Sequence, residues 1–168
     1  MSRAGDHCCE EPNHRGDPEG EVGDGNPVVV VYTLAQAIGA LKAAARAGQP
    51  VRLLSAANAG VCAGVGWFSA LVDAARAAVP AARCTALLDC GDQPGAVLAA
   101  IRIGVEAVIF AGRADVARRL GEIAARHGVG FRRTRPAADL DLIDDFFASE
   151  DESAQHCAAL LERLQRSR

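Results

Sequence analysis

The sequence predicts an α/β fold in which about five parallel strands alternate with helices. Short apolar runs rich in valine and leucine alternate with alanine-rich segments of helical length, at a repeat of roughly 25 residues. Half of the residues are hydrophobic but only 4% are aromatic, a balance typical of alanine-rich helices packed on valine and leucine strands. Connections this short favour right-handed crossovers, so the strands are expected to run parallel.

Five strands are predicted at the apolar runs, each short and continuous, as expected for strands buried on both faces of a sheet. They are 28–32, 51–55, 84–88, 107–110 and, with a weaker pattern, 129–132. Five helices are predicted between and after them, where capping residues, glycine or proline mark the limits. They are 34–47, 67–79, 94–103, 114–127 and 152–165. A loop rich in glycine and alanine, 56–66, joins the second strand to the second helix.

Two architectures accommodate these units. One is half of an eight-stranded TIM-type barrel with an added C-terminal helix, and the other is an open flavodoxin-like sheet. We divide the chain into an acidic N-terminal tail that is expected to be disordered, a βα domain, an acidic and hydrophobic arm, and an amphipathic C-terminal helix. Their limits are 1–26, 27–136, 137–151 and 152–168.

Charge is distributed unevenly along the 168 residues, although the formal net charge is only −3. Residues 137–152 carry seven acidic side chains and no basic one, whereas 27–136 is basic overall. The acidic segments either remain solvated or dock on an arginine-rich surface of this chain or of a partner. The basic residues are not interleaved with aromatic ones, so we predict no nucleic-acid binding.

No signal-peptide pattern is present, and no apolar run approaches the roughly 20 residues that span a bilayer. We therefore expect a cytoplasmic protein without a membrane span, in which the six cysteines are reduced. The cysteine spacings match no zinc-binding pair and no disulfide framework. The group His7-Cys8-Cys9 with His14 either binds a soft metal or belongs to an incidental tail.

The best candidate for chemistry is Asp89-Cys90-Gly91, because it follows the third strand, where α/β folds usually place their active sites. Asp89 either acts as an acid or base, or caps the next helix and bonds loop backbone. Cys90 is either a reactive thiol near a helix N-terminus or a small residue in a tight loop.

Three blocks of the sequence carry a resemblance. They are Leu34-Ala35-Gln36-Ala37 through to Pro50-Val51, Ser55 with its glycine-rich loop and Ala70-Leu71-Val72, and Leu88-Asp89-Cys90-Gly91 with Ile103-Gly104. In this order and spacing, residues 28–132 resemble the N-terminal half of the class II fructose-bisphosphate aldolase family, which includes the tagatose-bisphosphate aldolases.

The resemblance implies a fold more than a reaction. In that family the aspartate works as an acid or base at the substrate carbonyl, and the histidine after it binds zinc. Asp89 matches the aspartate, Cys90 replaces the histidine, and the family's glutamates on the fifth strand are replaced by Arg132-Arg133-Thr134-Arg135. The other zinc ligands of the family lie in the second half of the barrel. We therefore predict no cofactor, with a zinc ion at Cys90 as the alternative.

The first functional hypothesis is a non-catalytic, aldolase-like module that acts in assembly. Half of a barrel leaves two sheet edges and one apolar face open, so we expect a second copy, the chain's own C-terminal helix or a larger protein to cover them. The side chains expected to make such contacts are Leu140, Leu142, Ile143, Phe146, Phe147, Leu160, Leu161 and Leu164. The alternative of equal weight is an extended arm that packs on its own body.

The second hypothesis is a sugar-phosphate-binding protein or a lyase of the class II aldolase type that uses Asp89 and Cys90. A small anionic ligand would then lie at the carboxyl ends of the strands. The residues predicted to hold it are Ser55, Gly91, Arg113 and Arg132.

Overall fold

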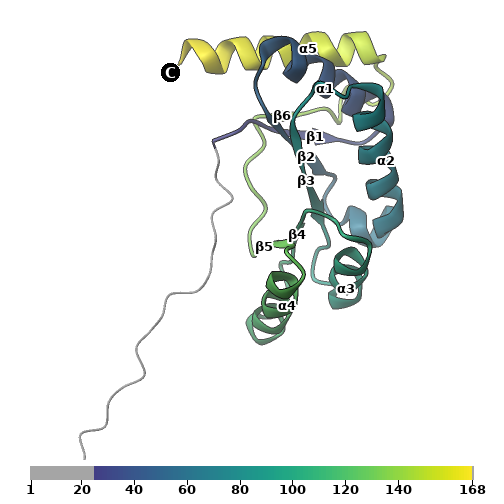
Figure 1. Cartoon of the computed structure of the whole chain (residues 1–168), viewed down its shortest axis with the longest axis vertical. Coiled ribbons are helices and arrows are strands. Elements are labelled where there is room, and N and C mark those ends of the chain that lie inside the picture. The colour runs from purple at the N-terminus through teal and green to yellow at the C-terminus, as the bar shows by residue number, and fades with distance from the viewer. Residues whose placement is uncertain (1–24, 168) are drawn as a thin grey trace, which may run out of the picture.

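The computed structural model describes residues 25–167 and contains one sheet of six parallel strands, in the order β5-β4-β3-β2-β1-β6 (Figure 1). The strands are β1 (Val28–Val31), β2 (Val51–Ser55), β3 (Cys84–Asp89), β4 (Ala107–Ile109), β5 (Gly130–Arg132) and β6 (Leu140–Asp141). The five predicted strands are present, and β6 is an addition. The group His7-Cys8-Cys9 with His14, for which metal binding was one alternative, lies outside the described residues.

The helices begin and end close to the predicted limits. They are α1 (Leu34–Ala47), α2 (Val65–Ala78), α3 (Pro94–Ile103), α4 (Ala114–Arg126) and α5 (Glu150–Arg166). The expected loop 56–66 is wrong in part, because it contains a π-helical turn, η1 (Gly60–Gly64), that leads directly into α2. Glycine and alanine carry no periodic apolar signal, so this turn could not be seen in the sequence pattern.

Strands β1 to β5 are neighbours in the order in which they occur in the chain. Right-handed connections between such strands place every crossover helix on the same face of the sheet, as in a TIM-type barrel. A flavodoxin-like sheet reverses its strand order and carries helices on both faces. The chain therefore forms the barrel-type sheet, with α1 to α4 on its convex face (Figure 1).

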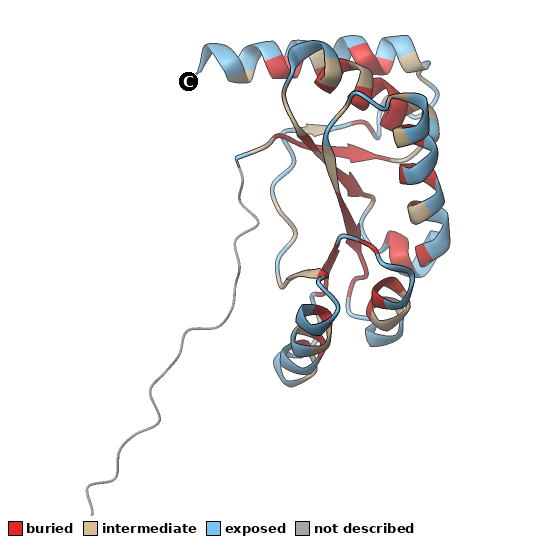
Figure 2. Ribbon diagram, viewed as in Figure 1, coloured by how far each residue is buried: buried red, intermediate tan, exposed pale blue. Residues whose placement is uncertain are grey.

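The concave face is apolar and is covered by the chain itself. Its side chains are 0–3% exposed and belong to Val28, Val30, Leu54, Leu87, Ala107 and Ile109. The segment that we call the strap, residues 133–139, runs from the end of β5 to the start of β6 on this side (Figures 1 and 2). At its far end Asp139 accepts the Val28 N–H through Oδ2 at 2.8 Å and donates its own N–H to the Val28 carbonyl at 2.9 Å. The expected cover of this face is therefore supplied by the chain itself, through the strap and not through the C-terminal helix.

The C-terminal segment covers the β1 edge of the sheet in the same way. β6 pairs in parallel with β1, and α5 lies along α1 (Figure 1). Ser149 begins α5 with a capping box in which Glu152 takes part. Leu142, Leu160 and Leu161 are at most 4% exposed, and Leu140 and Leu164 are partly buried against the same core. Of the two alternatives that the sequence left open for these five leucines, contact with a partner or packing on the chain's own body, the structure shows the second: β6 pairs with β1, and α5 packs on α1.

Gln36 joins this C-terminal segment to the start of α1. Its side-chain Oε1 accepts the N–H groups of Tyr32 and Thr33 at 2.7 and 3.3 Å. Its Nε2 donates to the carbonyls of Leu142 and Asp145 at 2.7 and 3.0 Å. Gln36 is fully buried, so these bonds satisfy an amide that would otherwise be costly to bury.

By length and composition alone, the stretch Gly60–Ala78 is apolar enough to cross a membrane. Here it forms η1 and α2, and 28% of the stretch is buried. A helix that covers a sheet satisfies the same criterion, so this is weak evidence for a span.

α1 and α5 approach each other closely at Gly39. A Cβ atom there would lie 2.6 Å from the Cβ of Ser153 and 2.7 Å from the carbonyl oxygen of Glu150. We expect Gly39→Ala to lower the free energy of unfolding by about 2 kcal/mol, because both helices must move apart. Urea denaturation followed by circular dichroism measures this. Gly66→Ala is the matched control, since open space surrounds Gly66 on α2, and it should be neutral or stabilising. Equal stability of the two variants would contradict the packing described.

Candidate functional site

The predicted site lies at the carboxyl ends of β2 and β3. Ser55 and Asp89 are the last residues of these neighbouring strands, so their side chains meet at one end of the sheet. The Ser55 hydroxyl accepts the Asp89 N–H at 2.9 Å, and Asp89 Oδ1 accepts the Gly91 N–H at 2.8 Å. Asp89 is 6% exposed. One carboxylate oxygen is thus already used to fix the loop that follows β3.

The other carboxylate oxygen of Asp89 is bound by an arginine of the strap. Arg135 donates from Nη1 to Asp89 Oδ2 and from Nη2 to the Ser55 carbonyl, each at 2.7 Å. The side chain of Asp89 is 9% exposed and that of Arg135 is 29% exposed. A guanidinium so placed neutralises the carboxylate and stands between it and the solvent. Asp89 is therefore held as one half of an internal ion pair.

Cys90 lies beneath this pair and points into the core. It is fully buried, and a Cβ atom at Gly60 would lie 3.1 Å from its Sγ, so η1 packs directly on the thiol. Burial, with a smaller contribution from the Asp89 carboxylate, raises the pKa of Cys90 to about 12. Cys90 is accordingly a neutral thiol in a tightly packed loop. Gly91 continues this loop at φ 56°, where a side chain would collide with the amide oxygen of Asn58.

The zinc site implied by the family resemblance does not fit these residues. The Cys90 thiol is fully buried and Gly60 packs against it, so it does not face a space in which an ion could meet other ligands. Within residues 25–167, no three side chains of His, Cys, Asp or Glu are grouped so as to hold a metal. No role for a metal is derived from this site.

The arginine bound to Asp89 is neither of the two, Arg113 and Arg132, that were predicted to hold an anion. Arg113 is exposed and pairs with Asp115 at 3.0 Å, before the start of α4. Arg132 is half-buried in β5, and Arg133 of the strap donates to the Gly112 carbonyl at 3.0 Å. The arginine that reaches Ser55 and Asp89 is Arg135. The arginine-rich run 132–135 was visible in the sequence, but only the path of the strap decides which of its side chains turns toward Asp89.

The arm leaves three large apolar side chains on the surface. Ile143 and Phe146 are 48% and 45% exposed, and Phe147 is 97% exposed. The two phenyl rings make an edge-to-face contact, with centroids 5.2 Å apart. They stand in the connection between β6 and α5, at the same end of the sheet as Asp89.

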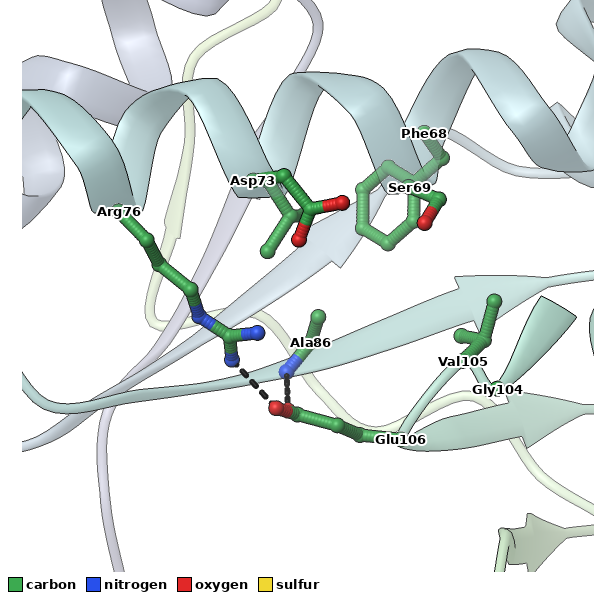
Figure 3. Close-up of a pocket in the computed structure, with 9 residues that line it drawn as sticks. Phe68, Ser69, Asp73, Arg76, Ala86, Gly104, Val105 and Glu106 are labelled. Atoms are coloured by element: carbon green, nitrogen blue, oxygen red, sulfur yellow. Dashed lines mark hydrogen bonds and ion pairs between the residues drawn. The ribbon is translucent and has the colours of Figure 1, made fainter.

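Two of the hollows in the described part of the chain bear on function. The first has a volume of about 40 Å³ and lies where β3 and β4 begin, between Phe68 and Arg76 of α2 and the residue Glu106 (Figure 3). Arg76 and Glu106 form an ion pair there, and Glu106 also accepts the Ala86 N–H at 2.7 Å. It has room for little more than a water molecule. It lies at the amino ends of the strands, which in barrel-type folds contribute to stability and not to catalysis.

The second hollow is an open groove of about 480 Å³ between the start of α1 and the first turns of α2. Its size falls in the range of ligand-binding pockets. Its lining is almost entirely apolar and consists of Tyr32, Thr33, Leu34, Trp67, Ala70, Leu71 and Ala74. No part of this groove was predicted from the sequence.

Comparison with known proteins supports the fold. No family model and no curated protein sequence matches the chain. Similar structures are known, and one is the crystal structure of a Coccidioides immitis protein assigned as a fructose-1,6-bisphosphate aldolase. The TM-score is 0.52 at 19% sequence identity, and the match covers 63% of this chain and 44% of that one. The chain thus adopts an aldolase-like α/β fold and spans less than half of that relative. At this identity the similarity establishes the fold alone.

The ion pair between Asp89 and Arg135 should contribute more to the free energy of unfolding than an exposed ion pair does. We expect Arg135→Ala to lower the free energy of unfolding by about 2 kcal/mol, because it leaves the buried Asp89 carboxylate without its cation. Arg113→Ala, which breaks the exposed pair with Asp115, should change it by less than about 0.5 kcal/mol. Urea denaturation compares the two variants. Adding Asp89→Asn to Arg135→Ala should restore part of the loss, and an Arg135→Ala variant as stable as Arg113→Ala would contradict the pairing.

Cysteine reactivity should differ sharply between positions. With a pKa of about 12, Cys90 is almost entirely protonated at neutral pH, and it is buried, so iodoacetamide should not modify it in the folded protein. Cys62 is exposed and should be modified within minutes. Peptide mass spectrometry after a short pulse distinguishes them, and unfolding in urea should make both reactive. Modification of folded Cys90 at the rate of Cys62 would contradict its burial.

Proposed function

We propose that this chain is a non-catalytic, aldolase-like module that acts in protein–protein assembly, as an accessory or regulatory subunit in the cytoplasm. The observation that carries the proposal is the ion pair between Asp89 and Arg135. An acid or base must reach the substrate and exchange its proton during the reaction. Asp89 instead uses both carboxylate oxygens to hold the Gly91 backbone and the Arg135 side chain.

The apolar surface favours an assembly role. Seven large apolar side chains are exposed in residues 25–167. Six of them lie at the carboxyl ends of the strands, either in the connecting segments or in the first turn of the helix that follows. They are Leu34, Val61, Trp67, Ile143, Phe146 and Phe147. The seventh, Ile103, ends α3 at the opposite end of the sheet. Apolar groups gathered at one end of a molecule mark a site of interaction more often than scattered ones do.

Two measurements test this proposal. The purified chain, with and without added zinc, should neither cleave fructose 1,6-bisphosphate nor be thermally stabilised by it. A photo-reactive phenylalanine analogue at position 147 should give a discrete cross-linked product in the host cell, because this side chain projects from the apolar end. The same analogue at position 103 is the matched control, since Ile103 is also exposed but lies at the other end, and it should give none.

Each result has a clear opposite. Cleavage that disappears in Asp89→Ala would establish the alternative, a class II-type lyase or sugar-phosphate-binding protein that uses Asp89 and Cys90. Equal cross-linking from positions 147 and 103 would contradict a specific assembly surface at the apolar end.

A further inference from the structure

The groove between α1 and α2 combines an apolar floor with an acidic end. Leu34, Trp67 and Leu71 are the larger apolar side chains of its lining, and Tyr32, which follows β1, also lines it. β6 pairs with β1 so that Asp141 lies opposite Val30, two residues before Tyr32. Burial and the nearby carboxylates of Asp141 and Asp144 raise the pKa of the Tyr32 phenol. Tyr32 thus belongs to the lining of the groove and has two carboxylates near its phenol.

The charges facing Tyr32 do not cancel. Arg135 is the cation near this side chain, but it is already paired with Asp89. Asp141 and Asp144 are exposed, and neither forms an ion pair with a basic side chain among residues 25–167. The groove therefore keeps a negative potential at this end, which attracts cations.

We propose that this groove binds a positively charged, amphipathic segment of a partner protein, an inference that rests on the proposed assembly role. Its apolar side chains would enter between α1 and α2, beside Trp67, and its lysine or arginine side chains would face Asp141 and Asp144. Helix-in-groove recognition of this kind needs an apolar channel of this size with charges at its border. The carboxylates of Asp141 and Asp144 would favour a positively charged partner over a neutral or negatively charged one.

A second copy of this chain is a poorer occupant. Residues 137–152 carry seven acidic side chains and no basic one. Two copies brought together at this end would place these acidic segments near each other, and like charges in an interface cost free energy. A basic segment meets no such repulsion.

Trp67 is the only tryptophan in the chain, so its fluorescence reports on the groove directly. The probe is an amphipathic peptide of about 12 residues built from leucine and lysine, and its counterpart replaces every lysine with glutamate. The lysine peptide should change Trp67 fluorescence saturably and bind at least about tenfold more tightly than the glutamate peptide. Its affinity should fall as salt is raised from about 50 to 500 mM, because the charges are exposed.

Variants identify the surface. Ala74→Arg places a cation on the groove floor and should abolish binding. Ala77 is also exposed and lies on the same helix but does not line the groove, so Ala77→Arg should bind the peptide as the unaltered chain does. The double substitution of Asp141→Asn and Asp144→Asn should weaken binding by about tenfold.

Three outcomes would overturn the proposal. They are equal binding of the two peptides, no saturable change in Trp67 fluorescence, or binding unaffected by Ala74→Arg. A dimer of the unaltered chain that Ala74→Arg dissociates would also overturn it, since a second copy would then fill the groove. If the groove fails these tests while position 147 still cross-links a protein, the assembly role stands and only this partner assignment fails. If the peptide binds but position 147 cross-links nothing, the groove stands and the assembly role at Phe147 fails.

Discussion

An unclosed parallel sheet of barrel type must cover its concave apolar face, and the rest of this structure depends on how that is done. The strap crosses this face and leaves its side chains at most 3% exposed. To do so, it must run from the carboxyl end of β5 to the amino end of β6, because β6 pairs in parallel with β1. The strap therefore sets the start of β6, and β6 in turn places the connection to α5 against Gln36 and α1.

The path of the strap also explains the state of the site. A segment that crosses the face must pass the carboxyl ends of β2 and β3, where Ser55 and Asp89 end their strands. Arg135 occupies this point of the crossing. A buried carboxylate without a partner costs several kcal/mol, whereas one paired with a guanidinium is tolerated. The covering of the sheet and the neutralisation of Asp89 are thus achieved by the same segment.

Sequence periodicity predicted most of the elements because their signals are local. The valine run that forms β1 and the Thr33 side chain that caps α1 are signals of this kind, because each acts within a few residues. β6 has only two residues, too few for a periodic signal. The stripe of Leu160 and Leu161 was recognised as a packing face, but its partner, α1, is more than 100 residues away in the chain. The pairing of Arg135 with Asp89 is of the same kind, since it depends on tertiary structure.

The distribution of charge separates the interior of the site from its border. At the site, Asp89 is compensated by Arg135, so little net charge remains where the family resemblance expects chemistry. At the border, Asp141 and Asp144 lie on the surface beside the apolar groove and the phenyl rings of Phe146 and Phe147. Electrostatic attraction acts over roughly the Debye length of about 8 Å, so exposed carboxylates influence an approaching molecule more than an internal pair does. The exposed charges and apolar side chains that could recognise another molecule therefore lie at the border of the sheet's carboxyl end, and not at Asp89.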